Sequence, residues 1–473
     1  MGVRGLARLA RTRCTPTRVE LGPANKLLID GPALTYHLFQ ETRIPWHAGG
    51  DLASFARAVR GFASDLCSCG VRLEIFFDLA EAVDDAKIQC TLQRRAGDVR
   101  AVKKVVKALA NAECPPGFVL PLLAFDVVRT VFKDLGVPVT EASASVPFGC
   151  EADPYIARAA GLDPSAIVLT NDSDLLCFAQ VSAVAFLDYL EVVDDSLTVV
   201  RTFRPQQVAA ALGIAEKDLP SLACLVGNDH GDPMEIALWH DKLKLNRSAL
   251  NSQQVILAAA AALRKQGTAL ATKLGSSWQQ AHAHTEAWYG EASQNASTPS
   301  VSVADCYWWP RPVVEDFGKS DFIADILRPL REAILGDQLR LERGPPQFTP
   351  ILRCFSDSEN KLQELRSCAE RVKTGMNTDA VIDIAQLCLR MSSIEPFDDA
   401  EIARIKTVWS KSKESHNASA MVPATQKIPT PRLASTASLL QGVLHTVFSL
   451  SGSSDTNKTI PLSYFFDASH LIP

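Results

Sequence analysis

Short apolar runs that end at an acidic residue recur along the first half of this chain. Three of them are plain: residues 27–29 before Asp30, residues 73–77 before Asp78, and residues 166–170 leading through Asn171 to Asp172 and Asp174. Runs of this length without polar alternation are typical of strands that are buried on both faces of a parallel sheet. The pattern predicts an α/β fold, with a parallel sheet flanked by helices.

Two further segments extend the pattern. Residues 137–139 lead through a loop to Glu151 and Asp153, which open a predicted helix from Pro154 to Ala160, and proline suits the first helical turn. Residues 225–228 are interpreted as the end of a last strand before Asp229. Seven acids are therefore predicted at strand ends: Asp30, Asp78, Glu151, Asp153, Asp172, Asp174 and Asp229.

These acids are expected to converge, because the crevice beyond the carboxyl ends of parallel strands is where such sheets bind their ligands. Unit charges about 4 Å apart repel by roughly 4 kcal/mol at an effective dielectric constant near 20, so an ionised cluster needs divalent cations. Oxygen ligands favour Mg²⁺ or Mn²⁺. Each acid alone has another interpretation: Asp172 and Glu151 could cap helices, and Asp30 could close a turn. Their joint occurrence favours a metal site.

The chain resembles a known family at six short motifs that occur in order. They are residues 1–6 (MGVRGL), 28–31 (LIDG), 76–78 (FFD), 151–153 (EAD), 170–174 (TNDSD) and 227–230 (GNDH). The family is the flap endonuclease/XPG nucleases, and His230, the EAD motif and the glycine pair at 49 and 50 resemble its Asteroid-like branch. The resemblance covers about the first 245 residues. It implies a PIN-like core that cuts phosphodiester bonds with two metal ions, Mg²⁺ with Mn²⁺ as a substitute.

The resemblance also implies roles for the seven acids. Two ions about 4 Å apart activate the attacking water and stabilise the leaving oxygen. One ion would take Asp30, Asp78, Glu151 and Asp153 and the other Asp172, Asp174 and Asp229, or the acids would share the ions through waters; the sequence leaves this partition open. Asp153 stands where the family has glutamate, which is one methylene longer, so this ligand would reach its ion through water.

A basic segment follows the second acid. Residues 86–110 contain one acid, Asp98, and seven basic residues in a chain of net charge −5: Lys87, Arg94, Arg95, Arg100, Lys103, Lys104 and Lys107. Lys87 and Arg94 are seven residues apart and would share one helix face. The resemblance implies a helical arch in which these two contact the scissile phosphate as catalytic residues, while Gly2, Arg95, Arg100, Lys103 and Lys104 bind nucleic acid. The alternative is an ordinary solvated helix.

The N-terminus has two interpretations. Residues 1–19 hold five arginines and no acid, a composition that also describes a mitochondrial transit peptide. The resemblance favours a structural segment beside the active site, and a protein of the nucleus or cytoplasm without a signal peptide. No membrane partner is expected, because the longest uncharged apolar run, residues 255–263, is far shorter than the roughly 20 residues that span a bilayer. The twelve cysteines are scattered and indicate neither zinc ribbons nor disulfides.

The second half of the chain, residues 246–473, is predicted to be mainly helical. Apolar spacing predicts helices at residues 255–274, 322–343, 360–372, 380–391 and 433–450, with loops near 291–302, 344–360 and 411–432. In the family, a Gly-x-Gly hairpin that follows the last acid binds the phosphates of duplex DNA. No such hairpin is recognisable in this sequence, because residues 231–274 contain only Gly231 and Gly267. Single-stranded or branched DNA, or even RNA, is therefore as plausible a partner as a double-stranded flap, and single-stranded or branched DNA is the expected one.

Two function classes remain. The first is a structure-selective endonuclease in DNA repair or processing, and the second is a non-catalytic PIN-like scaffold in post-transcriptional RNA regulation. Retention of all seven acids favours the enzyme, because a scaffold has no need of mutually repelling groups. Residues 459–466 resemble a sliding-clamp binding box at Leu462, Phe465 and Phe466. Thr459 stands where glutamine is expected, so packing of these aromatic side chains on the helical region is favoured over clamp binding.

Overall fold

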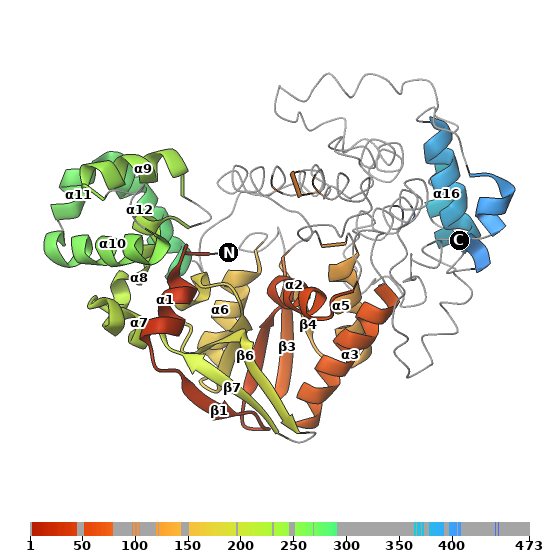
Figure 1. The fold of residues 1–473 in the computed structure, drawn as a ribbon, viewed down its shortest axis with the longest axis horizontal. Helices are drawn as coiled ribbons and strands as arrows, with labels where there is room; N and C mark the ends of the chain where they lie inside the picture. The colour runs from red at the N-terminus through yellow and green to blue at the C-terminus, as the bar shows by residue number, and fades with distance from the viewer. Residues whose placement is uncertain are drawn as a thin grey trace.

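A twisted, mostly parallel sheet forms the centre of the molecule (Figure 1). The computed structural model describes residues 2–44, 52–78, 123–142, 151–194, 197–228, 231–245, 251–267, 269–290, 378–391 and 397–403, with a few shorter pieces. Within these residues the sheet has seven strands in the order β1-β7-β6-β5-β2-β3-β4. Their bounds are β1 Thr17–Glu20, β2 Lys26–Asp30, β3 Arg72–Phe77, β4 Val139–Glu141, β5 Ala166–Thr170, β6 Val184–Asp194 and β7 Leu197–Phe203.

The strands from β6 to β4 run parallel, whereas β7 and β1 add an antiparallel edge. Successive side chains of a strand point to opposite faces, so each inner strand contributes to two cores. Leu27 and Ile29 of β2 lie in one core, and Leu28 lies in the other. This double burial explains why the inner strands are mostly apolar, with β3 interrupted by Glu74. It confirms the predicted fold class of a parallel sheet flanked by helices.

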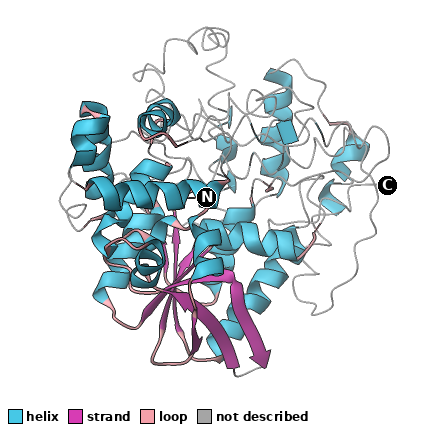
Figure 2. Cartoon of the chain, turned by 60° about the vertical axis from the view of Figure 1, so that its left-hand side comes forward, coloured by secondary structure: helices cyan, strands magenta, loops and turns pink. Residues whose placement is uncertain are grey.

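Helices cover both faces of the sheet (Figure 2). Their buried residues place α2 Gly31–Glu41, α3 Leu52–Ser68 and α5 Ala124–Asp134 in the first core, together with α16 Thr378–Met391. The second core contains α1 Leu6–Arg13, α6 Ala152–Leu162 and α7 Pro205–Leu212. Within the described residues no helix combines the length and the apolar character needed to cross a membrane.

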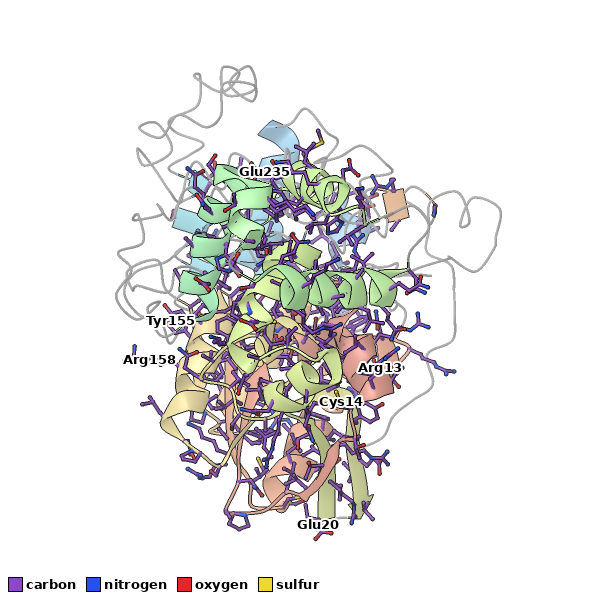
Figure 3. The ribbon with its side chains drawn as sticks, turned by 90° about the vertical axis from the view of Figure 1, so that its left-hand side faces the viewer. Arg13, Cys14, Glu20, Tyr155, Arg158 and Glu235 are labelled. Carbon is purple, nitrogen blue, oxygen red and sulfur yellow. The ribbon has the colours of Figure 1, made fainter. Side chains whose placement is uncertain are left out.

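Five helices then form what we call the helical extension. They are α8 Leu219–Val226, α9 Pro233–Lys242, α10 Ser252–Gln266, α11 Ala269–Leu274 and α12 Ser276–Tyr289. In Figure 3 Glu235, on α9 of the helical extension, lies at the opposite end of the molecule from Glu20 of β1. Ile256, Trp278 and Tyr289 share the second core with Leu28 of the sheet. The division of the chain after residue 245 stays a prediction, and α10 to α12 pack in the same core as the sheet.

Three details differ from the sequence-based expectations. Leu225 and Val226 end helix α8 and not a strand, and Gly227 follows with a positive φ of 101°. The helix expected at 255–274 is divided between α10 and α11, because Gly267 adopts a φ of 46° and ends α10. The strands β1, β6 and β7 were not anticipated; β1 is largely exposed and carries no apolar run.

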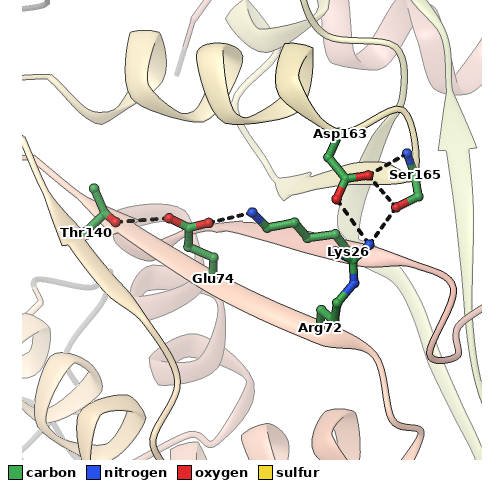
Figure 4. A network of polar contacts seen from close by, with 6 residues as sticks. All are labelled: Lys26, Arg72, Glu74, Thr140, Asp163 and Ser165. Carbon is green, nitrogen blue, oxygen red and sulfur yellow. Dashed lines mark hydrogen bonds and ion pairs between the residues drawn. The ribbon is translucent and has the colours of Figure 1, made fainter.

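A polar network joins the amino-terminal ends of the inner strands (Figure 4). Glu74 of β3 pairs with Lys26 of β2 at 2.8 Å and accepts a hydrogen bond of 3.1 Å from Thr140 of β4. Beside it, Arg72 pairs with Asp163 at 3.1 Å and donates to Ser165 at 2.9 Å. These contacts link β2, β3, β4 and the segment before β5. They therefore support the register that aligns the opposite, carboxyl ends of the strands.

Candidate metal centre

Carboxylates gather at the carboxyl ends of three adjacent strands. Asp30 ends the middle strand, β2, and its register partner on β3 is Phe76, two residues before Asp78. On the other side, β5 pairs with β2 up to Leu169 and leads into Asp172 and Asp174. The sheet thus brings four of the predicted acids, which are widely separated in sequence, to one edge.

Helix α6 adds two more acids to this edge. The backbone N–H of Ala152 donates to Asp78 Oδ1 at 2.8 Å, so the start of α6 is tied to the end of β3. Glu151 directly precedes the helix and is buried, with 7% of its surface exposed, yet its side chain makes no capping hydrogen bond. Asp153 lies in the first helical turn. Helix capping therefore does not account for Glu151, which directly precedes the Ala152 N–H that contacts Asp78.

Asp30 is the most enclosed of these acids, with 6% of its surface exposed. Its Oδ1 accepts from the Ala33 N–H at 3.0 Å and caps α2, while its Oδ2 accepts from the Thr170 hydroxyl at 2.5 Å. The pKa of Asp30 is raised from 3.8 to about 6. Burial raises it most, the hydrogen bonds from Ala33 and Thr170 lower it, and the charges of Asp172 and Asp78 raise it by smaller amounts. Asp30 therefore both caps α2 and belongs to the acidic cluster.

Asp172 and Asp174 occupy a tight turn after β5. The Asp172 N–H donates to the Thr170 hydroxyl at 2.8 Å, and the Asp174 N–H donates to Asp172 Oδ1 at 3.0 Å. Asp174 is buried, with 4% exposed. Its Oδ1 accepts from the Val3 N–H, and its Oδ2 accepts from the Tyr289 hydroxyl at 3.0 Å. The N-terminus, the β5 turn and the end of α12 therefore meet at one carboxylate.

The N-terminal segment is built into this site. Gly2 has a φ of 59°, and a Cβ there would overlap the carboxylate oxygens of Asp172 and Asp174. The Ser173 hydroxyl donates to the Val3 carbonyl at 3.1 Å, and Val3, Leu6 and Leu9 are buried in the second core. The segment lies beside the acids, as the resemblance implied. Only glycine fits at position 2, because of both the close approach and the positive φ.

Several expected residues lie outside the described part of the chain. These are Asp229 among the acids and Lys87, Arg94, Arg95 and Lys103 among the basic residues. Arg100 and Lys104 are described, as exposed helical residues. Sequence reasoning did not find Thr170 or Tyr289. Thr170 is the first residue of the TNDSD motif but was assigned no role, whereas Tyr289 is 115 residues from Asp174 and carried no local signal.

The donor set fits hard divalent cations. It consists of carboxylate oxygens, and the raised pKa of Asp30 reflects a dry, crowded anionic cluster that a cation would neutralise. Hydrogen bonds to their carboxylate oxygens hold Asp30, Asp78 and Asp174. In metal sites, hydrogen bonds of this kind orient the side chains that bind the metal. In the described ranges no three acidic, histidine or cysteine side chains already form a metal-binding group. Asp229, the remaining predicted ligand, lies outside them.

Comparisons with known proteins find one family model and relatives with two different names. Residues 102–284 match a family model described as XPG domain containing. The single-strand DNA endonuclease ASTE1 of Danio rerio is 28% identical over 213 residues, which is 43% of this chain and 29% of that protein. The constitutive coactivator of peroxisome proliferator-activated receptor gamma of Mus musculus is 27% identical over 220 residues, or 46% of this chain and 25% of that protein. This chain therefore spans about a quarter of the length of these relatives.

Solved structures are also similar. The catalytic core of Rad2 in complex with DNA substrate is 17% identical, with a TM-score of 0.36, covering 67% of this chain and 93% of that one. Human GEN1 in complex with Holliday junction DNA is 14% identical, with a TM-score of 0.31, covering 73% of this chain and 82% of that one.

Proposed function

Because this chain belongs to the flap endonuclease/XPG superfamily of PIN-like nucleases, on its Asteroid-like branch, we propose that it is a metal-dependent DNA endonuclease. It would hydrolyse phosphodiester bonds of single-stranded or branched DNA, in DNA repair or processing, in the nucleus or cytoplasm. The observation that carries the proposal is the cluster of carboxylates at the ends of β5, β2 and β3, joined by the start of α6.

In this proposal some residues bind the metal ions and others orient those residues. Asp30, Asp78, Glu151, Asp172 and Asp174 would hold two Mg²⁺ or Mn²⁺ ions, with Asp153 and Asp229 completing the set. When bound, such ions activate the attacking water and stabilise the leaving oxygen. Thr170 and the Ala33 N–H orient Asp30, and the Val3 N–H orients Asp174. The protein thus supplies charge and position, and needs no nucleophile of its own.

Basic residues would bring the phosphate to this site. We infer that Lys87 and Arg94 contact the scissile phosphate, and that Gly2, Arg95, Arg100, Lys103 and Lys104 contact neighbouring nucleotides. The exposed positions of Arg100 and Lys104 support contact with a polyanion. Arg4, in the turn before α1, and Arg8, in α1, are also exposed and would extend the basic surface from the N-terminal side.

Two observations support single-stranded or branched substrates. A relative at 28% identity bears the name single-strand DNA endonuclease. In addition, the segment between α9 and α10, residues 243–251, contains no glycine, so these helices cannot present a Gly-x-Gly hairpin to duplex phosphates. The duplex grip of the family would therefore be absent while the acids remain.

The test is a substrate panel with the full-length purified chain. Labelled single-stranded DNA, a flapped duplex, a four-way junction, a plain duplex and single-stranded RNA are incubated with Mg²⁺, with Mn²⁺ and with EDTA. We expect metal-dependent cuts in the single-stranded and flapped DNA, and slower cutting of the plain duplex. Folded protein that cuts none of these would contradict the proposal and favour a scaffold. Preferential cutting of RNA would overturn the assigned substrate.

A further inference from the structure

Tyr289, the last residue of α12, connects the helical extension to the acidic cluster. It is fully buried, and its hydroxyl donates to Asp174 Oδ2 at 3.0 Å. Its ring packs edge-on against Phe178, with ring centres 4.9 Å apart at 83°. The side chain is therefore fixed by packing on the ring and by a hydrogen bond at the tip.

The backbone of Tyr289 makes a second connection to the same turn. The Ala179 N–H donates to the Tyr289 carbonyl at 3.1 Å, and Gly290 ends the helix directly afterwards. Both Ala179 and Phe178 lie just beyond Asp174 in sequence. Side chain and backbone thus hold the end of α12 against the segment 174–179.

The Tyr289 hydroxyl also reaches the segment that carries the seventh predicted acid. Asn228 Nδ2 donates to this hydroxyl at 3.4 Å, and Asn228 immediately precedes Asp229. A phenol can accept one hydrogen bond and donate another, so Tyr289 joins Asn228 to Asp174 in a single chain of contacts.

Two groups hold the Asp174 carboxylate, one at each oxygen. The Val3 N–H holds Oδ1, and the Tyr289 hydroxyl holds Oδ2. Without the hydroxyl, the carboxylate could rotate about its Cβ–Cγ bond, and its lone pairs would no longer point in one fixed direction. Mutation of a group that orients a metal ligand in this way typically lowers metal affinity or activity by about 10- to 100-fold.

We propose that Tyr289 is a positioning residue of the metal centre, which orients the Asp174 carboxylate and couples it to Asn228. The proposal rests on the proposed function, since it assumes that Asp174 is a metal ligand. It makes the helical extension a working part of the nuclease site, although Tyr289 lies beyond the part of the chain that resembles the family at its motifs.

The experiment measures Mn²⁺ binding directly, by calorimetric titration of the full-length chain, beside the Mn²⁺ dependence of cleavage. Tyr289→Phe removes the hydroxyl and keeps the ring on Phe178. We expect its Mn²⁺ affinity to fall about tenfold and its cleavage to need correspondingly more Mn²⁺. The matched control is Tyr189→Phe, since Tyr189 lies in β6 with its ring against Phe203. It should leave both quantities unchanged.

A coupling test separates positioning from simple packing. In an Asp174→Asn background Tyr289→Phe should produce no further loss of Mn²⁺ affinity, because its effect passes through that carboxylate. Asn228→Ala, which removes the donor to the same hydroxyl, provides a second variant should Tyr289→Phe fold poorly, and should weaken Mn²⁺ binding in the same direction. Circular dichroism checks folding throughout.

The outcomes for the inference and for the proposed function are distinct. Folded Tyr289→Phe with wild-type Mn²⁺ affinity would overturn the positioning role, whatever the nuclease activity of the chain. Mn²⁺ binding that depends on Tyr289 in a protein that cuts no nucleic acid would support the inference while the proposed activity fails. A wild-type chain that binds no Mn²⁺ would overturn both.

Discussion

At the scale of single residues, the acids of the cluster combine structural and chemical tasks. Asp30 caps α2 through the Ala33 N–H, Asp172 accepts from the Asp174 N–H within its turn, and Asp78 holds the start of α6. A helix cap and a metal ligand were alternatives when each acid was considered alone. Because a strand that ends in a helix cap also ends at the carboxyl edge of the sheet, one carboxylate can serve both purposes.

The burial of Asp30 predicts that the free energy of unfolding depends on pH. Its pKa is about 6 in the folded protein against an ordinary value of 3.8, so the folded state binds this proton more tightly. The stability that this provides is present below about pH 4 and is lost as the pH rises through about 6. Asp30→Asn should therefore gain roughly 2 kcal/mol over the wild type between about pH 4.5 and 7.5 in EDTA. Urea denaturation of both proteins at the two pH values measures this difference.

Saturating Mg²⁺ provides the control for that measurement, because a bound cation would offset the cost in the wild type at the higher pH. A stability difference between the two proteins that does not change with pH would show that Asp30 is ionised equally in the folded and unfolded chain.

Asp172 and Asp174 should differ in what their removal does to stability. Asp174→Ala leaves the Val3 N–H and the Tyr289 hydroxyl buried without their acceptor, at a cost of about 1–3 kcal/mol each. Asp172→Ala removes a half-buried acid, and the relief of repulsion opposes the loss of its contacts. Urea unfolding in EDTA should therefore find the Asp174 variant clearly less stable. Equal stability of the two variants would argue against the hydrogen bonds that hold Asp174.

At the scale of elements, the order of the strands accounts for what the sequence could reveal. The inner strands β2, β3 and β5 are buried on both faces, so their apolar runs and terminal acids were readable. Helix α8 is buried nearly all round, and its final residues, Leu225 and Val226, were mistaken for a strand for the same reason. An apolar run reports burial, and it does not by itself distinguish a short strand from an enclosed helix.

The N-terminal segment carries an element-scale prediction. A side chain at position 2 would overlap the carboxylates of Asp172 and Asp174, at a backbone φ of 59° that non-glycine residues avoid. Gly2→Ala should therefore displace the segment from the acids, lower Mn²⁺-dependent cleavage severely and cost on the order of 1 kcal/mol in stability. Gly61→Ala, at a helical glycine of α3 with open space around it, serves as the matched control. Wild-type cleavage by Gly2→Ala would mean that the segment does not pack as described.

At the scale of the whole molecule, the helical extension and the sheet share one core. Ile256, Leu270, Leu274, Trp278 and Tyr289 are buried in the same cluster as the residues of β2 and β5. The sequence placed a boundary near residue 245, because apolar periodicity changes there from strand to helix. Periodicity does not reveal which elements pack together, and this is why neither the shared core nor the contact between Tyr289 and Asp174 could be predicted.

Truncation tests this shared core. A chain ending at residue 245 loses, among others, these five large buried side chains of the second core, worth roughly 1.5–3 kcal/mol each, a sum comparable to the whole stability of a typical domain. We expect it to lose cooperative thermal unfolding, as followed by near-ultraviolet circular dichroism. A chain ending at residue 290, which retains α8 to α12, is the matched comparison. If the shorter chain unfolded cooperatively at the temperature of the full-length protein, α10 to α12 would not be needed for the fold of the sheet.

The central claim is that the carboxylates at the ends of β5, β2 and β3 form a metal-dependent phosphodiesterase site. Its most direct test is the initial rate at which a 5′-labelled single-stranded oligonucleotide is cut in Mn²⁺ by the full-length wild type and by the Asp30→Asn, Asp172→Asn double variant. We predict that the wild type cuts, that EDTA abolishes cutting, and that the folded double variant is slower by at least roughly a thousandfold. Cutting by the folded double variant at the wild-type rate would contradict the claim.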